Sequence, residues 1–143
     1  MRTTARWAAT IALAATAVGW PLTAAVAQPA PAPASLYAPS ALVLTVGHGE
    51  SSADTTVERA VTLACEPTAA GTHPDAEGAC GQLRQSRGDF DRLPENTAGI
   101  CTREYNPVVV TAEGVWQGKR VSYERVYAND CVRKSQGSRV FSF

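Results

Sequence analysis

The sequence lacks an excess of charge of either sign. Its 143 residues carry 13 Lys and Arg against 13 Asp and Glu, which gives a formal net charge of zero. Proteins that bind nucleic acid by neutralising phosphates need a basic surface, and this charge balance provides none. Nucleic acid is therefore not an expected partner. A length of 143 residues also indicates a single domain.

No hydrophobic run is long enough to cross a membrane. The longest, residues 7–20, has 14 residues, too few to span a hydrocarbon core of about 30 Å as a helix, so no membrane association is expected. Two arginines precede this run, and the small-residue tripeptide AVA at 25–27 follows it. That order is typical of a secretory signal peptide. We predict a signal peptide over residues 1–27, cut before Gln28, and hence a secreted, extracellular protein.

The segment after the predicted cleavage point is short and rich in proline. Residues 28–35 read QPAPAPAS. Alternating proline and alanine favour an extended, solvated polyproline II conformation, so we expect a flexible leader here. The folded domain is predicted to comprise residues 36–143.

Cysteines are few, and none of them has a metal-binding spacing. An even number of cysteines behind a secretion signal indicates two disulfides, with three possible pairings. No Cys-x-x-Cys pair occurs, and His48 and His73 are isolated, so no metal site is expected. The four cysteines are Cys65, Cys80, Cys101 and Cys131.

The usual signatures of catalysis are missing. The chain has no Gly-x-Ser-x-Gly motif, no phosphate-binding glycine loop and no cofactor fingerprint. Both histidines lie at predicted turns, and Asp89 and Asp91 follow Gly88 in a predicted solvated loop. A serine hydrolase needs a nucleophile, a base and an orienting acid together, and this pattern does not indicate them. We therefore expect no enzymatic activity and no cofactor.

Alternating hydrophobicity predicts an α+β domain with a mainly antiparallel sheet and one or two helices. The first strand has two apolar faces and should be central. One helix is clear, opened by Pro74 and stopped by Gly88. Glu113 and Gly114 suggest a turn, after which the sheet resumes at Val115. The predicted strands cover residues 41–46, 55–65, 108–112, 120–127 and 139–143.

Residues 100–107 (ICTREYNP) form an unusual segment before the third strand. A predicted disulfide fixes one end at Cys101, Pro107 stiffens the other, and Arg103 lies between them. One interpretation is an ordinary exposed loop. The other is a rigid, extended loop that presents an arginine to a protease, since a loop stiffened in advance loses less entropy on binding.

Four sequence blocks and the order of the cysteines resemble the Streptomyces subtilisin inhibitor family. The resemblance extends over nearly all of residues 36–143 and is interrupted mainly between Arg84 and Gly99. The blocks are LYAPSALVLTVG at 36–47, ERAVTL at 58–63, GTHP at 71–74 and GVWQGKRVSYERV at 114–126.

The resemblance implies a five-stranded antiparallel sheet and a homodimer packed through sheet faces. It also implies the disulfides Cys65–Cys80 and Cys101–Cys131. In this family the reactive bond follows the residue two positions after the third cysteine, which makes Arg103–Glu104 the expected bond here, flanked by Cys101, Thr102 and Tyr105.

The residues at this bond indicate the expected targets. An arginine before the bond suits trypsin-like proteases, whose acidic pocket pairs with a guanidinium. Subtilisin-like proteases are expected as well, because the family commonly inhibits them with varied residues at this position. The best-known member of the family that this chain resembles has a Met-Val reactive bond preceded by proline. This chain has an Arg-Glu bond at the matching place, preceded by Thr102.

A non-catalytic binding module of the cell envelope is the alternative function. Such a module would use aromatic side chains as a ligand-binding face, and Trp116, Tyr123 and Tyr127 are the candidates. Packing in the core or at a dimer contact is the competing interpretation of these three residues.

Overall fold

A five-stranded antiparallel sheet is the base of the fold. The structure, a computed structural model, describes residues 37–95 and 99–143. The predicted signal peptide and leader, residues 1–27 and 28–35, lie outside the described residues. The strands follow the order β3-β2-β1-β4-β5 across the sheet, so β1 is central as predicted. They are β1 (Ala41–His48), β2 (Arg59–Ala64), β3 (Ala70–Gly71), β4 (Val108–Trp116) and β5 (Lys119–Tyr127).

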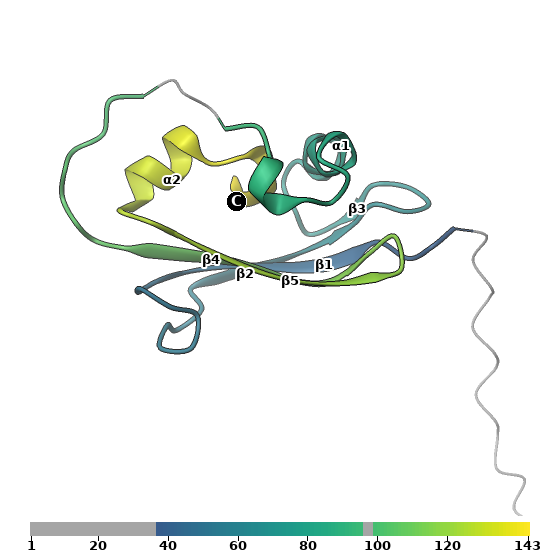
Figure 1. Cartoon of the computed structure of the whole chain (residues 1–143), viewed down its shortest axis with the longest axis horizontal. Helices are drawn as coiled ribbons and strands as arrows, with labels where there is room; N and C mark the ends of the chain where they lie inside the picture. The colour runs from purple at the N-terminus through teal and green to yellow at the C-terminus, as the bar shows by residue number, and fades with distance from the viewer. Residues whose placement is uncertain (1–36, 96–98) are drawn as a thin grey trace, which may run out of the picture. The chain divides into compact units, whose positions relative to one another are not determined.

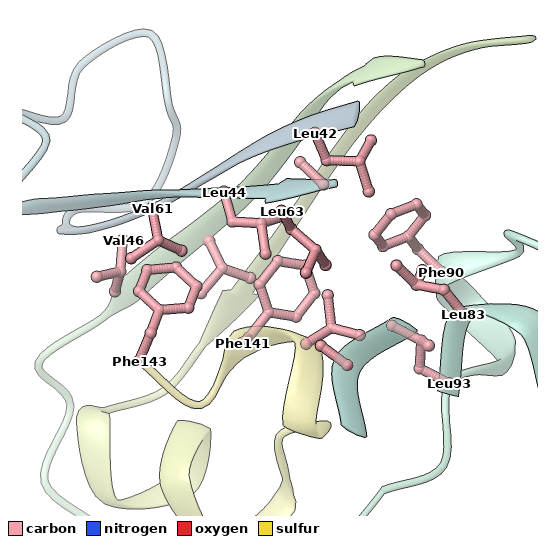
Figure 2. Packing of buried hydrophobic residues seen from close by; sticks show 14 of the residues in the cluster. Leu42, Leu44, Val46, Val61, Leu63, Leu83, Phe90, Leu93, Phe141 and Phe143 are labelled. Carbon is pink, nitrogen blue, oxygen red and sulfur yellow. The ribbon is translucent and has the colours of Figure 1, made fainter. Parts of the chain in front are cut away.

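All the helical elements lie over one face of this sheet, called here the inner face (Figure 1). Leu42, Leu44 and Val46 of β1 point inward and are buried, whereas Val43 on the opposite, outer face is 46% exposed. The inner side chains meet those of the helical layer in one hydrophobic core (Figure 2). The helical elements are α1 (Ala76–Gln85), η1 (Phe90–Arg92), α2 (Asp130–Gln136) and η2 (Arg139–Phe141).

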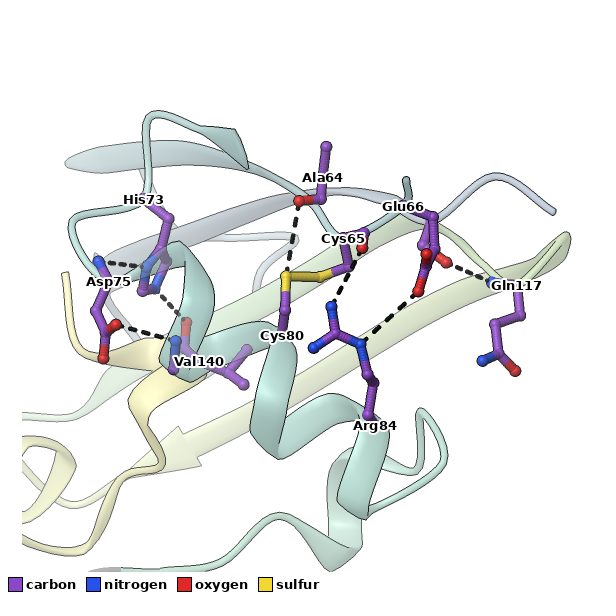
Figure 3. The surroundings of a disulfide bond; sticks show 11 residues. Ala64, Cys65, Glu66, His73, Asp75, Cys80, Arg84, Gln117 and Val140 are labelled. Atoms are coloured by element: carbon purple, nitrogen blue, oxygen red, sulfur yellow. Dashed lines mark hydrogen bonds and ion pairs between the residues drawn. A yellow bond between two sulfur atoms is a disulfide. The ribbon is translucent and has the colours of Figure 1, made fainter. Parts of the chain in front are cut away.

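Helix α1 begins where the sequence predicts a helix. The Asp75 carboxylate caps it by accepting a hydrogen bond of 3.0 Å from the Gly78 N–H. The Cys65–Cys80 disulfide joins the helix to the end of β2, with Cα atoms 5.5 Å apart. The Arg84 side chain, in the last turn of α1, donates to the main-chain carbonyl of Cys65 (Figure 3). This cross-link fixes the helix over the inner face.

The hairpin between β4 and β5 corrects the predicted turn at Glu113 and Gly114. Both residues lie inside β4, and the reversal occurs at Gln117 and Gly118, whose φ angles are 47° and 78°. Two consecutive positive φ angles match the twist of the flanking strands in a two-residue hairpin. Gly114 is needed for a different reason, because a Cβ there would collide with the Ala41 carbonyl of the neighbouring strand.

The C-terminal segment corrects the predicted closing strand. Residues 139–141 form the 3-10 helix η2, and Val140 and Phe141 are buried in the core. The Arg133 guanidinium of α2 donates to the Phe141 carbonyl, and Phe141 stacks on Tyr123 of β5, so the segment packs on the inner face of the sheet without pairing as a strand. The fifth strand is the short β3, which was not predicted. The strand predicted at 55–65 is shorter, beginning at Arg59.

Helix α2 was not predicted, although its signals are present. Asn129 caps its first turn, Asp130 lies in that turn, and Lys134 lies in the last one. These are favourable positions for an acidic and a basic residue along the helix dipole. Between α1 and the exposed segment, Phe90–Arg92 form the 3-10 helix η1, with Phe90 buried in the core. Within the described part of the chain, no helix has the length and hydrophobicity to cross a membrane.

Candidate functional site

An exposed, extended segment enters β4 from the side of α2. Residues 99–107 contain no helix or strand and lead directly to Val108, the first residue of β4 (Figure 1). The side chains of the five residues from Thr102 to Asn106 are all exposed. Those of Arg103 and Glu104 make no hydrogen bond or ion pair with the residues that the structure describes. Both side chains are therefore free to contact another molecule.

A disulfide fixes the segment two residues before Arg103. Cys101 is bonded to Cys131 in the first turn of α2, with Cα atoms 5.7 Å apart. This is the pairing that the resemblance implies. The bond joins residues 30 positions apart, so the start of the exposed segment is attached to a helix that belongs to another part of the sequence.

Asn129 holds the backbone on both sides of Arg103. Its side-chain amide N–H groups donate to the carbonyl oxygens of Thr102 at 3.2 Å and of Glu104 at 2.7 Å. The amide oxygen of the same side chain accepts from the Val132 N–H at 2.9 Å, and this hydrogen bond makes Asn129 the N-cap of α2. Asn129 is 7% exposed. A single side chain, oriented by the start of a helix, thus fixes the carbonyls before and after Arg103.

The part of the segment after Glu104 is held by main-chain hydrogen bonds. The Asn106 N–H donates to the Ala128 carbonyl at 2.9 Å, just after β5. The Pro107 carbonyl accepts from the Gly49 N–H, also at 2.9 Å, just after β1. Segments from two separate hairpins therefore anchor this half of the segment.

The Tyr105 side chain reaches back to the same β1–β2 connection. Its hydroxyl donates to the Glu50 carboxylate at 2.7 Å, while 65% of the residue remains exposed. This hydrogen bond, together with the negative charge of Glu50, raises the pKa of Tyr105 above its usual value. A phenol is protonated at neutral pH in any case, and this contact keeps the Tyr105 hydroxyl protonated and able to donate to a higher pH than usual.

The segment spans an open hollow instead of packing on the core. The hollow has a volume of about 390 Å³ and lies between the segment and α2, lined by Thr102, Glu104, Asn129, Val132 and Gln136 among others. The segment is supported by the disulfide, by Asn129, and by the contacts of Tyr105, Asn106 and Pro107, while the side chains of Arg103 and Glu104 between these contacts are exposed. Such an arch can enter the cleft of another protein without rearrangement of the core.

The predicted segment residues form one continuous surface, and Asn129 is the residue that the sequence analysis missed. Cys101, Thr102, Arg103, Glu104 and Tyr105 lie side by side because they are consecutive. Asparagine is favoured as the residue that caps the start of a helix, and Asn129 directly precedes an acidic residue. The sequence did not predict α2, so this capping preference could not be linked to a helix.

The histidines and the paired aspartates have structural roles. Buried His73 accepts from the Asp75 N–H at Nδ1 and lies 3.2 Å from the Val140 carbonyl at Nε2, just before the start of α1. Exposed His48 lies 3.8 Å from Glu58. Asp89 caps η1. In residues 37–95 and 99–143, no three His, Cys, Asp or Glu side chains are grouped as metal ligands would be.

The aromatic residues proposed for a ligand face belong mainly to the core. Trp116 and Tyr127 are 4% and 5% exposed. Tyr123 is half-buried and stacks on Phe90 with ring centroids 5.0 Å apart. These positions support the packing interpretation and remove the observation on which the cell-envelope module depended.

Comparisons with known proteins agree with this geometry. The model of the subtilisin inhibitor-like family matches residues 38–129. The chain is 62% identical to a subtilase-type protease inhibitor of Streptomyces coelicolor and 63% identical to the trypsin inhibitor STI2 of Streptomyces longisporus. Each of these alignments covers all of both chains.

A solved structure has the same fold. It is Streptomyces caespitosus sermetstatin in complex with Bacillus licheniformis subtilisin, and its inhibitor chain is 38% identical to this one, with a TM-score of 0.67. The match covers 73% of this chain and 99% of the other. The family is one of protease inhibitors, not of enzymes. From the family match and the two full-length relatives, it follows that the chain belongs to the subtilisin inhibitor-like family.

Proposed function

We propose that this protein inhibits serine proteases of the trypsin and subtilisin types by offering Arg103–Glu104 as a substrate-like reactive bond. The observation that carries this proposal is the exposed Arg103 between two carbonyls that one buried asparagine holds. The names of the relatives, among them a trypsin inhibitor, and the subtilisin bound to sermetstatin support the two classes of target.

The segment binds the protease as an extended strand. Arg103 enters the specificity pocket, where an acidic group in a trypsin-like enzyme pairs with its guanidinium. The Arg103 carbonyl lies in the oxyanion hole, next to the nucleophilic serine. Because Asn129 and the Cys101–Cys131 disulfide already hold the backbone extended, little conformational entropy is lost on binding.

Cleavage of the bond is slow and reversible because both new ends stay in place. The serine hydroxyl adds to the Arg103 carbonyl carbon, its proton passes through the protease histidine to the Glu104 nitrogen, and the peptide bond breaks to give an ester and an amine. The Glu104 carbonyl and the Asn106 N–H keep the amine side attached to Asn129 and Ala128. The amine therefore competes with water for the ester, and the original bond forms again.

Secretion through the signal peptide at residues 1–27 is part of this proposal. An extracellular inhibitor encounters extracellular proteases, and its disulfides form in an oxidising environment. N-terminal sequencing of protein recovered from the culture medium tests the cleavage point. We expect a chain that begins at Gln28, and an N-terminus at Met1 would contradict the prediction.

A homodimer formed through the outer face of the sheet is also part of the proposal. On this face Val43 and Val126 are 46% and 40% exposed, although both lie in strands. On the same face, Thr45 of β1 and Thr111 of β4 form a hydrogen bond of 2.7 Å, and the Ser122 hydroxyl donates to the Glu113 carboxylate at 2.7 Å, so these polar groups are paired within the sheet. A flat face of this kind can pair with a second copy of itself about a two-fold axis.

Titration of the purified mature protein against trypsin and subtilisin tests the inhibitory function. We expect residual trypsin activity to fall linearly to a sharp endpoint near one chain per active site. Inhibition of subtilisin without trypsin would exclude Arg103 as the specificity residue. Degradation of the protein without inhibition of either enzyme would refute the proposed function.

A further inference from the structure

The β1–β2 connection, residues 49–58, contacts the exposed segment after the proposed reactive bond. It does so at two adjacent residues. The Gly49 N–H donates to the Pro107 carbonyl at 2.9 Å, and the Glu50 carboxylate accepts from the Tyr105 hydroxyl at 2.7 Å. The family match and the sequence motifs give Glu50 no role. It is nevertheless the one side chain of this connection that holds a side chain of the segment, among the contacts within the described residues.

Glu50 is presented by a well-ordered turn. The Thr55 hydroxyl donates to the Ser51 carbonyl at 2.6 Å, and the Asp54 N–H donates to the same carbonyl at 3.3 Å. Ser52 hydrogen-bonds through its N–H and its hydroxyl to the Glu124 carboxylate of β5, which fixes the turn to the sheet. Because the turn is held at both places, the fold sets the backbone that carries Glu50, and the hydrogen bond from Tyr105 orients its carboxylate.

We propose that Glu50 is a positioning residue for the leaving side of the Arg103–Glu104 bond. By holding Tyr105, it keeps the segment that carries the new Glu104 amine beside the acyl-enzyme and so favours resynthesis of the bond. This inference rests on the proposed function, since it requires that bond to be the reactive one. Within the described structure, Glu50 makes no hydrogen bond or ion pair with Arg103 or Glu104, and it acts through Tyr105.

The hydrogen bond has the right chemistry and place for this role. A phenol that donates to a carboxylate forms a charge-assisted bond, which is stronger than one between neutral groups. The raised pKa of Tyr105 reflects the same contact. Tyr105 directly follows Glu104, so this contact acts one residue from the new amine and adds to the main-chain contact at Asn106.

The test measures the equilibrium between intact and cleaved inhibitor with a catalytic amount of trypsin. Reduction of the disulfides followed by mass spectrometry separates and identifies the two forms. We expect Glu50→Ala and Tyr105→Phe each to raise the ratio of cleaved to intact protein by about three- to tenfold, as loss of one hydrogen bond would. The double variant should give no further increase, because both changes remove the same contact.

Two further variants distinguish the effect of the hydrogen bond to Tyr105 from the effect of negative charge near it. Glu50→Gln keeps an acceptor for the Tyr105 hydroxyl and should change the ratio less than Glu50→Ala. Asp54→Asn removes one negative charge from the same turn, where the Asp54 carboxylate has no partner among the described residues, and should leave the ratio unchanged. An alkaline absorbance titration of the phenols supplies a separate readout. Glu50→Ala should move one tyrosine to lower pH, and this shift should be missing in the Tyr105→Phe background.

The outcomes distinguish this inference from the proposed function. If the parent protein is cut elsewhere than after Arg103, or does not inhibit trypsin, the proposed function fails and the role of Glu50 fails with it. If the parent is cut there but the Glu50 and Tyr105 variants keep the parental ratio, only the role of Glu50 is refuted. Equal effects of Asp54→Asn and Glu50→Ala would also refute it, since they would show a general effect of charge.

Discussion

At the scale of single residues, different side chains contact the protease and support the reactive segment in the proposed inhibition. Arg103 is exposed and its side chain makes no hydrogen bond or ion pair in the described structure, which suits a group that binds a protease pocket. Asn129 is buried and cannot reach that pocket, yet it holds the carbonyls on either side of Arg103. Substitution of Arg103 should therefore weaken protease binding, whereas substitution of Asn129 should make the reactive segment easier to cleave.

Arg103→Ala should abolish the tight, stoichiometric inhibition of trypsin while leaving the fold intact. Removal of a central interface residue costs on the order of 2–4 kcal/mol or more of binding free energy. At about 1.4 kcal/mol for each factor of ten, the inhibition constant should rise by about 30- to 1,000-fold. Titration of trypsin activity measures the change. Lys119→Ala, in the exposed start of β5, is the control and should change little, so equal losses from both variants would refute the assignment of the loop.

Asn129→Ser should separate the support of the loop from the stability of the helix. Serine can still cap α2 through its hydroxyl, but it lacks the two amide N–H groups that bind Thr102 and Glu104. We expect a melting temperature near that of the parent and faster cleavage by trypsin during long incubation. Asn129→Ala removes the cap as well and should cost about 1 kcal/mol of folding free energy. If the serine variant resists cleavage as well as the parent does, Asn129 does not support the loop.

At the scale of secondary-structure elements, two glycines differ in the space that surrounds them. Gly114 lies in the middle of β4 opposite β1, where a side chain would meet the Ala41 backbone. Gly81 lies within α1, where an added Cβ would meet no atom within 4 Å. The same substitution should therefore have opposite effects in the two elements.

Gly81→Ala should stabilise the protein and Gly114→Ala should destabilise it. Alanine is favoured over glycine inside a helix by roughly 0.8–1.0 kcal/mol. At Gly114, by contrast, φ is 144° and the space is closed, so alanine must strain the backbone and separate β4 from β1. Chemical denaturation of the two variants measures both changes in unfolding free energy. A loss of stability in the Gly81 variant, or a gain in the Gly114 variant, would contradict this description of the two sites.

Asp130 should make α2 sensitive to acid. Burial alone would raise the pKa of this carboxyl, but hydrogen bonds from Lys134 and Arg133 outweigh burial and hold the pKa below its usual value of 3.8. A depressed pKa in the folded state gives stability that is present above pH 3.8 and is lost as the pH falls through the folded value.

Thermal unfolding of Asp130→Asn between pH 7 and pH 2 tests this dependence. The variant should melt below the parent at pH 7, and the difference should shrink as the pH falls below 4. A difference that is constant with pH would mean that the ionised carboxylate contributes nothing to the effect.

The sequence could predict the elements whose signals are local. Alternation in β1 and β5, the proline and acidic start of α1, and the loop around Arg103 all reflect neighbouring residues. The failures depend on partners that are distant in the chain. The turn at Gly114 was wrong because that glycine serves contact with β1, and the strand at 139–143 was wrong because Phe141 is held by Arg133 of an unpredicted helix. Asn129 was missed for the same reason, since both of its loop contacts are at least 25 residues away.

At the scale of the whole molecule, the two faces of the sheet have separate uses. The inner face carries the core and the helical layer, and the outer face leaves Val43 and Val126 exposed. The exposed segment enters the sheet at one end of β4, so a partner on the outer face and a protease at the segment use different surfaces.

A charge at Val43 should dissociate the proposed dimer without loss of inhibition. Val43→Glu would bring two carboxylates together in a symmetric interface, because the same face of both copies takes part. Analytical ultracentrifugation should give a dimer for the parent and a monomer for the variant. The trypsin titration endpoint per chain should remain unchanged. A parent that sediments as a monomer at all concentrations would refute the dimer.

The disulfide between Cys101 and Cys131 makes the proposed activity a property acquired during maturation. Before oxidation, residue 101 has no covalent link to α2 other than the chain itself, and only hydrogen bonds from Asn129 hold the carbonyls around the arginine two positions later. We therefore expect the reduced protein to be a substrate and the oxidised protein an inhibitor, with identical peptide backbones. With the proposed export, the chain would become an inhibitor only after it leaves the cytoplasm, and it would not block proteases inside the cell that makes it.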